Sequence, residues 1–126
     1  MYKRILIILS FFTWTTASSQ NDSMRQVQYN QEVQTGKELQ DKYNYIISYL
    51  TKNKSKKALT CKKALIDSQK YWQMYVSYSC YLEAMPASET PRGSDPFYRE
   101  CTVDKSKQRL VELNKLDADI RSALGE

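Results

Sequence analysis

The stretch SQKYWQMYVSYSCYLEA, residues 68–84, holds one tryptophan, four tyrosines and a cysteine, and it contains neither glycine nor proline. In and just before it, a set of residues recurs at intervals of three and four: Leu65, Gln69, Trp72, Val76 and Ser79 or Cys80. That spacing places side chains on one side of an α-helix. The stretch is therefore predicted to be the second half of a helix over about residues 56–84.

Similar spacing predicts a helix on either side of this one. The apolar stripe before it consists of Leu39, Tyr43, Ile46 and Leu50, and the stripe after it of Val103, Leu110, Leu113, Leu116, Ile120 and Leu124. These stripes predict helices over about residues 23–50 and 96–124, with Gly36 as a weak point in the first. No alternating run typical of a strand is present. The expected fold is all-α, a small three-helix up-down-up bundle.

The prolines mark the main loop. All three, Pro86, Pro91 and Pro96, lie between the second and third predicted helices. Because proline ends helices but is tolerated in a first turn, residues 85–95 are predicted to form the loop. Ser94 or Asp95 is then placed to cap the third helix.

The N-terminus has the composition of a secretory signal peptide. Lys3 and Arg4 precede an uncharged, largely apolar run over residues 5–14, and small residues follow up to Ser19. The other interpretation is a membrane anchor, but a spanning helix needs about 20 apolar residues. We therefore expect a signal peptide over residues 1–19 and an exported domain, periplasmic or secreted, over residues 20–126. No transmembrane segment is expected after cleavage.

Three cysteines follow the expected signal peptide, so an oxidising compartment permits one disulfide and leaves one thiol over. Cys80 ends the second predicted helix and Cys101 begins the third, at adjacent ends of the bundle. Cys61 lies about 28 Å from Cys80 along the same helix. The expected disulfide is Cys80–Cys101. Cys61 is then either a buried small hydrophobe or a thiol that could join two molecules.

Most catalytic chemistry is absent from the sequence. With no histidine there is no imidazole base and no histidine-containing zinc site, and the cysteine spacing matches no metal-ligand pattern. Phosphate-binding glycine motifs are also missing. The carboxylates near the main loop are explained without catalysis, because acidic residues are common at helix starts and on solvated surfaces. We expect no enzyme activity, no cofactor and no metal.

The net charge of +5 falls to +3 once Lys3 and Arg4 are removed, leaving 17 basic against 14 acidic residues. Most of the excess lies between Lys52 and Lys63, around the first interhelical turn. Such a cluster is either a solvated turn or a site for an anionic wall polymer through Lys54, Lys56 and Lys57. Nucleic acid is not an expected partner of an exported protein.

The aromatic row divides around the helix. Trp72 points with Gln69 and Val76, whereas Tyr71, Tyr75 and Tyr78 point elsewhere. We expect Trp72 and one tyrosine-bearing side to build the core, and the remaining tyrosines to be available to a partner. The two roles, core and interface, stay open for the row as a whole.

The spacing of several of these residues resembles that of a known family. The pattern reads Gln69-x-x-Trp72-x-x-Tyr75-x-x-x-x-Cys80, then Gly93-Ser94, then Cys101-x-x-x-x-Ser106-x-x-Arg109-x-x-x-Leu113, with Leu39-Gln40-x-x-Tyr43 upstream. It is similar to the lysozyme-inhibitor LprI-like N-terminal domain family. The chain departs from that family's pattern at Gln40, at Val76-Ser77 and at Ser106. It also lacks the family's early cysteine pair and has Cys61 in addition.

The resemblance implies a helical, disulfide-tied, exported domain, and one branch of the family is linked to inhibition of lysozyme. It also implies a structural role for the residues that match the family pattern: Leu39, Tyr43, Gln69, Trp72, Tyr75, Ser106, Arg109 and Leu113. An inhibitor would place a rigid protrusion in the lysozyme cleft, and the loop with Arg92, Gly93 and Ser94 is the expected partner-binding segment, Arg92 facing the catalytic carboxylates. A mild positive charge opposes binding to a basic lysozyme. The alternatives are a non-inhibitory envelope module that binds another protein or an anionic polymer, and a structural domain without a ligand.

Overall fold

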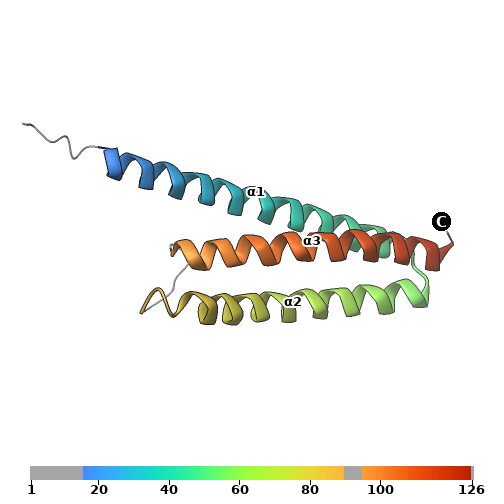
Figure 1. The fold of residues 1–126 in the computed structure, drawn as a ribbon. Coiled ribbons are helices and arrows are strands. Elements are labelled where there is room, and N and C mark those ends of the chain that lie inside the picture. The colour runs from blue at the N-terminus through green and yellow to red at the C-terminus, as the bar shows by residue number, and fades with distance from the viewer. Residues whose placement is uncertain (1–15, 90–94, 126) are drawn as a thin grey trace, which may run out of the picture.

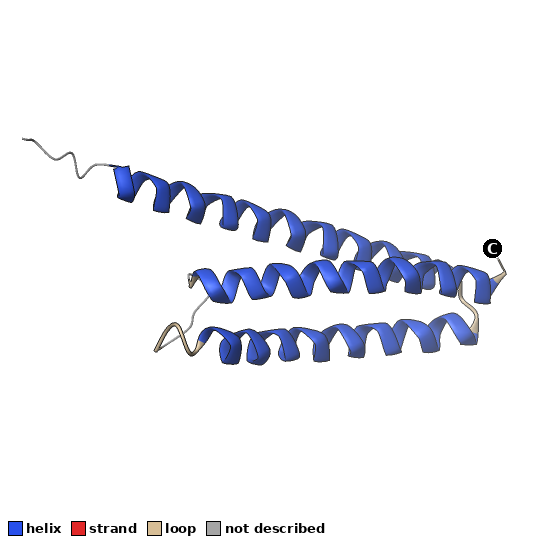
Figure 2. Cartoon of the chain, viewed as in Figure 1, coloured by secondary structure: helices blue, strands red, loops and turns tan. Residues whose placement is uncertain are grey.

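The computed structural model describes residues 16–89 and 95–125, which form three helices and no strand (Figure 1). Helix α1 spans Thr16–Lys52, α2 spans Lys56–Ala84 and α3 spans Pro96–Leu124. Successive helices run in opposite directions, and α3 lies between α1 and α2 in the view of Figures 1 and 2. The predicted all-α three-helix bundle is confirmed. Most of the expected signal peptide, residues 1–15, lies outside the described residues.

The first helix is longer than the sequence pattern indicated. It begins at Thr16 rather than near Ser23, because no glycine or proline interrupts residues 16–22. Gly36 does not break it either, and a Cβ at that position would meet no atom within 4 Å. The apolar stripe starts only at Leu39, so it locates the packed half of α1 and misses the half that precedes it.

The helix ends follow local capping rules. The Ser55 hydroxyl accepts a hydrogen bond from the Ala58 amide at 3.1 Å and starts α2. The Asp95 carboxylate accepts from the amides of Phe97 and Tyr98, so Asp95 is the cap of α3. Gly125 ends α3 in the left-handed region at φ 93°, where glycine carries no Cβ penalty.

The core lies between the inner sides of the three helices. Its main cluster contains Leu39, Ile46, Leu50, Ala58, Leu65, Leu113 and Ile120, and a second cluster contains Val76, Cys80 and Cys101. Helix α1 packs more extensively on α3 than on α2, and its N-terminal half leans away from α2 (Figure 1). The bundle is therefore tighter at the end that carries the first turn.

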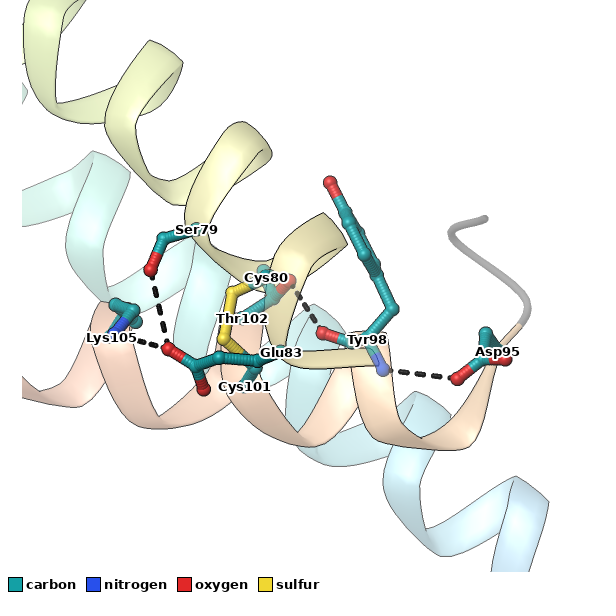
Figure 3. The surroundings of a disulfide bond; sticks show 8 residues. All are labelled: Ser79, Cys80, Glu83, Asp95, Tyr98, Cys101, Thr102 and Lys105. Carbon is teal, nitrogen blue, oxygen red and sulfur yellow. Dashed lines mark hydrogen bonds and ion pairs between the residues drawn. A yellow bond between two sulfur atoms is a disulfide. The ribbon is translucent and has the colours of Figure 1, made fainter. Parts of the chain in front are cut away.

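A disulfide joins Cys80 and Cys101 with their Cα atoms 5.5 Å apart, as the sequence predicted (Figure 3). It ties the last turns of α2 to the first turns of α3 at the end where α1 leans away. Next to it, Lys105 and Glu83 form an ion pair at 3.0 Å, and the Ser79 hydroxyl donates to the same carboxylate. These contacts hold α2 against α3 without help from α1.

Candidate functional site

Three residues of the family pattern meet on one side of the α2–α3 pair. The Arg109 guanidinium donates to the Gln69 side-chain oxygen at 3.3 Å and to the Ser68 hydroxyl at 2.8 Å. It also pairs with Glu112 at 3.0 Å and lies 6.0 Å from the centre of the Trp72 ring. Only 11% of the Arg109 side chain is exposed. Arginine's fixed fork of donors suits such a clamp, which fixes α3 against α2.

The other pattern positions differ in burial. Leu39, Ser106 and Leu113 are buried, and Tyr43 packs on the core cluster. Tyr75 is instead 56% exposed, with the Lys105 ammonium 5.5 Å from its ring centre. Tyr75 therefore takes no part in core packing, because it lies at the exposed edge of α2, where the Lys105 side chain of α3 approaches its ring.

The lean of α1 leaves a groove of about 290 Å³ between the helices. Four pattern residues line it, Leu39, Gln69, Trp72 and Ser106, together with Gly36, Gln40, Gln73, Val76, Ser77, Tyr98 and Thr102. Its wall mixes amide and hydroxyl groups with the aromatic side chains of Trp72 and Tyr98. The sequence pattern did not reveal this groove, because no periodicity reports the angle between two helices.

The outward side of α2 is apolar over its last four turns. We call it the tyrosine face and define it as Tyr71, Met74, Tyr75, Tyr78, Tyr81, Leu82 and Met85, whose side chains are between 42% and 68% exposed. The opposite side holds the buried residues Gln69, Val76, Cys80 and Ala84. The expectation that one tyrosine-bearing side joins the core is wrong. Trp72, only partly buried, is the one aromatic residue of the row that packs against the core clusters.

The comparison with protein families supports the resemblance drawn from the sequence pattern. The model of the family described as lysozyme inhibitor LprI matches residues 15–113. This chain belongs to the LprI family. No curated protein and no solved structure matches it. The match spans all of α1 and α2 and most of α3, so it covers the Arg109 clamp and the tyrosine face of this LprI chain.

Some lysines in and near the first interhelical turn of the LprI chain already form contacts within the bundle. The Lys57 ammonium donates to the Ala123 carbonyl at 2.9 Å, where a cation complements the C-terminal end of α3. Lys63 pairs with Asp67 at 2.7 Å, and this hydrogen bond raises the pKa of Lys63. Lys54 and Lys56 are exposed. Of the three lysines predicted to bind an anionic polymer, one therefore already has a partner within the bundle.

The predicted partner-binding residues Arg92, Gly93 and Ser94 lie outside the described residues. Their described flanks are well held. Ala87 and Ser88 donate backbone hydrogen bonds to the carbonyls of Ala84 and Met85, and Asp95 caps α3 on the other side. The segment thus starts and ends on backbone that the disulfide draws together.

The titratable groups beside the disulfide are coupled. The hydrogen bond from Lys105 lowers the pKa of Glu83 below its ordinary value of 4.5. The same bond raises the pKa of Lys105 above 10.5. Both groups therefore stay charged across the physiological range, and the ion pair is a lasting part of this end of the LprI bundle.

Cys61 is the free cysteine among the described residues. Its partly buried side chain lines a largely apolar cavity of about 270 Å³ between α2 and α3, together with Ala64, Leu65, Ser68, Leu116 and Ile120. Across the described ranges, no three side chains of the histidine, cysteine or carboxylate type gather as metal ligands. Within those same ranges, no helix has the length and apolar content that crossing a bilayer requires.

Proposed function

We propose that this LprI-family protein is exported and inhibits lysozyme by binding the enzyme as a protein partner. The observation that carries the proposal is the match to the lysozyme-inhibitor family over residues 15–113. The bundle supports it as a binding scaffold, because a disulfide, helix caps and the Arg109 clamp hold its helices in one arrangement. A rigid scaffold loses little conformational entropy on binding.

The lysozyme-binding part in this proposal is the disulfide end of the bundle, where the loop over residues 85–95 leaves α2 and enters α3. Phe97 follows this loop and is 55% exposed. It would supply an apolar contact at the rim of the lysozyme cleft. Lysozyme acts through two carboxyl groups in that cleft. Arg92 would pair with them through a guanidinium, the cation best shaped for carboxylates.

Charge limits the targets that suit this mode of binding. After removal of the expected signal peptide the chain carries +3, so long-range repulsion opposes its approach to a strongly basic lysozyme. A neutral or acidic lysozyme meets no such barrier. The proposal therefore favours inhibition that varies with lysozyme type.

The test is a cell-wall clearing assay with lysozymes of several types and a chain that begins at Gln20. We expect inhibition of at least one type, and a weaker effect from Arg92→Ala. Lys54→Ala is the matched control, because Lys54 is an exposed cation in the turn at the opposite end of the bundle. Absence of inhibition at large molar excess for every type would refute the function. Full inhibition by Arg92→Ala would refute only the role of Arg92.

The alternative of a non-inhibitory envelope module makes a different prediction. Lys54 and Lys56 are exposed and could bind an anionic wall polymer, although Lys57 already donates to Ala123. Salt-sensitive retention on isolated wall polymer would support this module. Retention that is unchanged when Lys54, Lys56 and Lys57 become Gln would exclude the lysine turn as its site.

A further inference from the structure

The tyrosine face is unusual for the exposed side of a helix, because it consists of large aromatic and apolar side chains. From Tyr71 to Met85, every position on the outward half of α2 is tyrosine, methionine or leucine. The polar residues over the same turns, Gln73, Ser77 and Glu83, are also exposed, but Gln73 and Ser77 line the groove and Glu83 pairs with Lys105 of α3. Soluble monomers rarely expose a continuous apolar patch of more than a few hundred Å². This side of α2 therefore has the composition of an interface.

The spacing within the face indicates what kind of element covers it. Tyr71, Met74, Tyr78, Tyr81 and Met85 follow one another at intervals of three, four, three and four residues. That alternation is the seam that one helix presents to another packed nearly in line with it. A second helix of similar length is therefore the matching occupant.

The area of the face is sufficient for a specific pair. A tyrosine side chain buries about 150–250 Å² when it is fully covered, so the four tyrosines at their observed exposures offer roughly 350–600 Å². Met74, Leu82 and Met85 add to this. A stable interface of standard size buries about 800 Å² per partner. One copy of the face supplies most of that area.

The charges along α2 determine the direction of the pairing. The half of α2 before the face carries five lysines, Lys56, Lys57, Lys62, Lys63 and Lys70, and a single carboxylate, Asp67. The half that carries the face has no lysine, and the exposed Glu89 follows it. Parallel copies would bring the two lysine-rich halves together. Antiparallel copies instead place the lysine-rich half of one α2 beyond the end of the other, with Lys70 opposite Pro86 and three residues from Glu89, and they oppose the two helix dipoles favourably.

We propose that the tyrosine face binds a second copy of this chain, with the two α2 helices antiparallel and the two-fold axis near Tyr78. In this pairing Tyr71 of one copy lies opposite Met85 of the other, and Met74 lies opposite Leu82. Methionine sulfur packs favourably against aromatic rings, so the face is complementary to itself. The disulfide end of each copy then lies beside the middle of its partner's α2.

The first test measures the mass of the chain from Gln20 onward by sedimentation velocity. That chain retains every contact described above, and circular dichroism checks its helix content. We expect a dimer that dissociates on dilution. Tyr78→Glu places two carboxylates in the centre of the interface and should raise the dissociation constant by about a hundredfold or more. Val111→Glu is the control and should leave it unchanged, because Val111 is a 69% exposed apolar residue on another helix.

A second test reads the direction of the pairing through disulfide trapping in a Cys61→Ser background. Tyr78→Cys should form a covalent dimer with itself. Tyr71→Cys should cross-link only when mixed with Met85→Cys. Self-cross-linking of Tyr71→Cys would instead indicate parallel helices and overturn the antiparallel arrangement.

The outcomes are separable from those of the lysozyme assay. A chain that stays monomeric at its highest soluble concentration, or a Tyr78→Glu variant that stays dimeric, overturns the proposal whatever the lysozyme result. A monomeric chain whose inhibition of lysozyme is lost in Tyr78→Glu would assign the face to lysozyme and likewise overturn it. A dimer lost in Tyr78→Glu and kept in Val111→Glu supports it even if no lysozyme is inhibited.

Discussion

Single side chains set the stability of the bundle in two distinct ways. Leu113 and Ile46 are enclosed on all sides and act through packing, whereas Arg109 and Lys105 act through directed hydrogen bonds at partly exposed positions. Packing losses leave a cavity that the surrounding helices cannot fill, so they cost more than the loss of a solvated ion pair. A few buried core side chains therefore account for most of the stability, whereas the hydrogen-bonding side chains mainly orient the helices.

Leu113→Ala should lower the free energy of unfolding by about 2–5 kcal/mol, because the side chain is fully buried and the substitution leaves a cavity. The measurement is urea denaturation followed by circular dichroism. Val111→Ala, two residues away on the exposed side of α3, should change stability by only about 0.5 kcal/mol or less. Equal losses from the two variants would contradict the buried position of Leu113.

The Glu83–Lys105 pair should make stability depend on pH in a defined window. The lowered pKa of Glu83 means that its contribution is present above the ordinary value of 4.5 and is lost as the pH falls through the folded-state pKa. The raised pKa of Lys105 means that its contribution is present below 10.5 and is lost above that pH. The Tm difference between the protein and Glu83→Gln should therefore persist from neutral pH down to 4.5 and vanish in stronger acid.

Lys105→Met supplies the matched control for that measurement. It removes the partner that lowers the pKa of Glu83, so it should abolish the same acid-dependent difference. A difference that grows as the pH falls would show that Glu83 is stabilised in its protonated form, which contradicts the ion pair.

At the scale of elements, the pairs α1–α3 and α2–α3 are held by different means. Helix α1 packs along α3 through the apolar cluster, and Lys42 adds an ion pair with Asp117 at 2.6 Å. Helix α2 is fixed to α3 by the Arg109 clamp and the disulfide. The packing of α2 on α3 is therefore expected to depend on formation of the disulfide, whereas the packing of α1 on α3 is not.

Replacing both Cys80 and Cys101 with Ser should lower the free energy of unfolding by about 3 kcal/mol, the loop-closure value for a separation of 21 residues. Urea denaturation under oxidising conditions measures it. Cys61→Ser, which leaves the bridge in place, should have a much smaller effect. Under a thiol reductant the protein and the double variant should become equally stable, and a persistent difference would point to lost packing at Cys80 instead.

For the whole molecule, the helices leave two kinds of surface. The lean of α1 opens a groove of mixed polarity lined by pattern residues, and the outward side of α2 exposes the tyrosine face. The loop end proposed to enter lysozyme lies at the same end of the bundle as the last turn of that face. A dimer formed through α2 would place two such loop ends on one assembly.

Salt should change inhibition in opposite directions for lysozymes of opposite charge. The chain after the expected signal peptide carries +3, so raising the ionic strength screens repulsion from a basic lysozyme and should strengthen inhibition about a few-fold. For an acidic lysozyme the same change should weaken it. Inhibition constants measured at low and physiological salt give the answer, and stronger inhibition of a basic lysozyme at low salt would contradict control by net charge.

Much of this architecture follows from local rules. The prolines, the Asp95 cap and the three- and four-residue spacings were sufficient to predict three helices, and the positions of Cys80 and Cys101 at adjacent ends were sufficient to predict their disulfide. These features depend on backbone geometry and on contacts within a turn or a short loop. The start of α1 was missed because its first half has no apolar stripe.

The sequence by itself determined which residues share a side of each helix, since the 3.6-residue period does so for any helix. It separated Trp72 from Tyr71, Tyr75 and Tyr78, but both sides of α2 are apolar enough to enter a core. Only the tertiary structure decided between them. With two neighbouring helices packed on one side of α2, the other side is left uncovered, and the position of those neighbours depends on contacts between segments far apart in the chain.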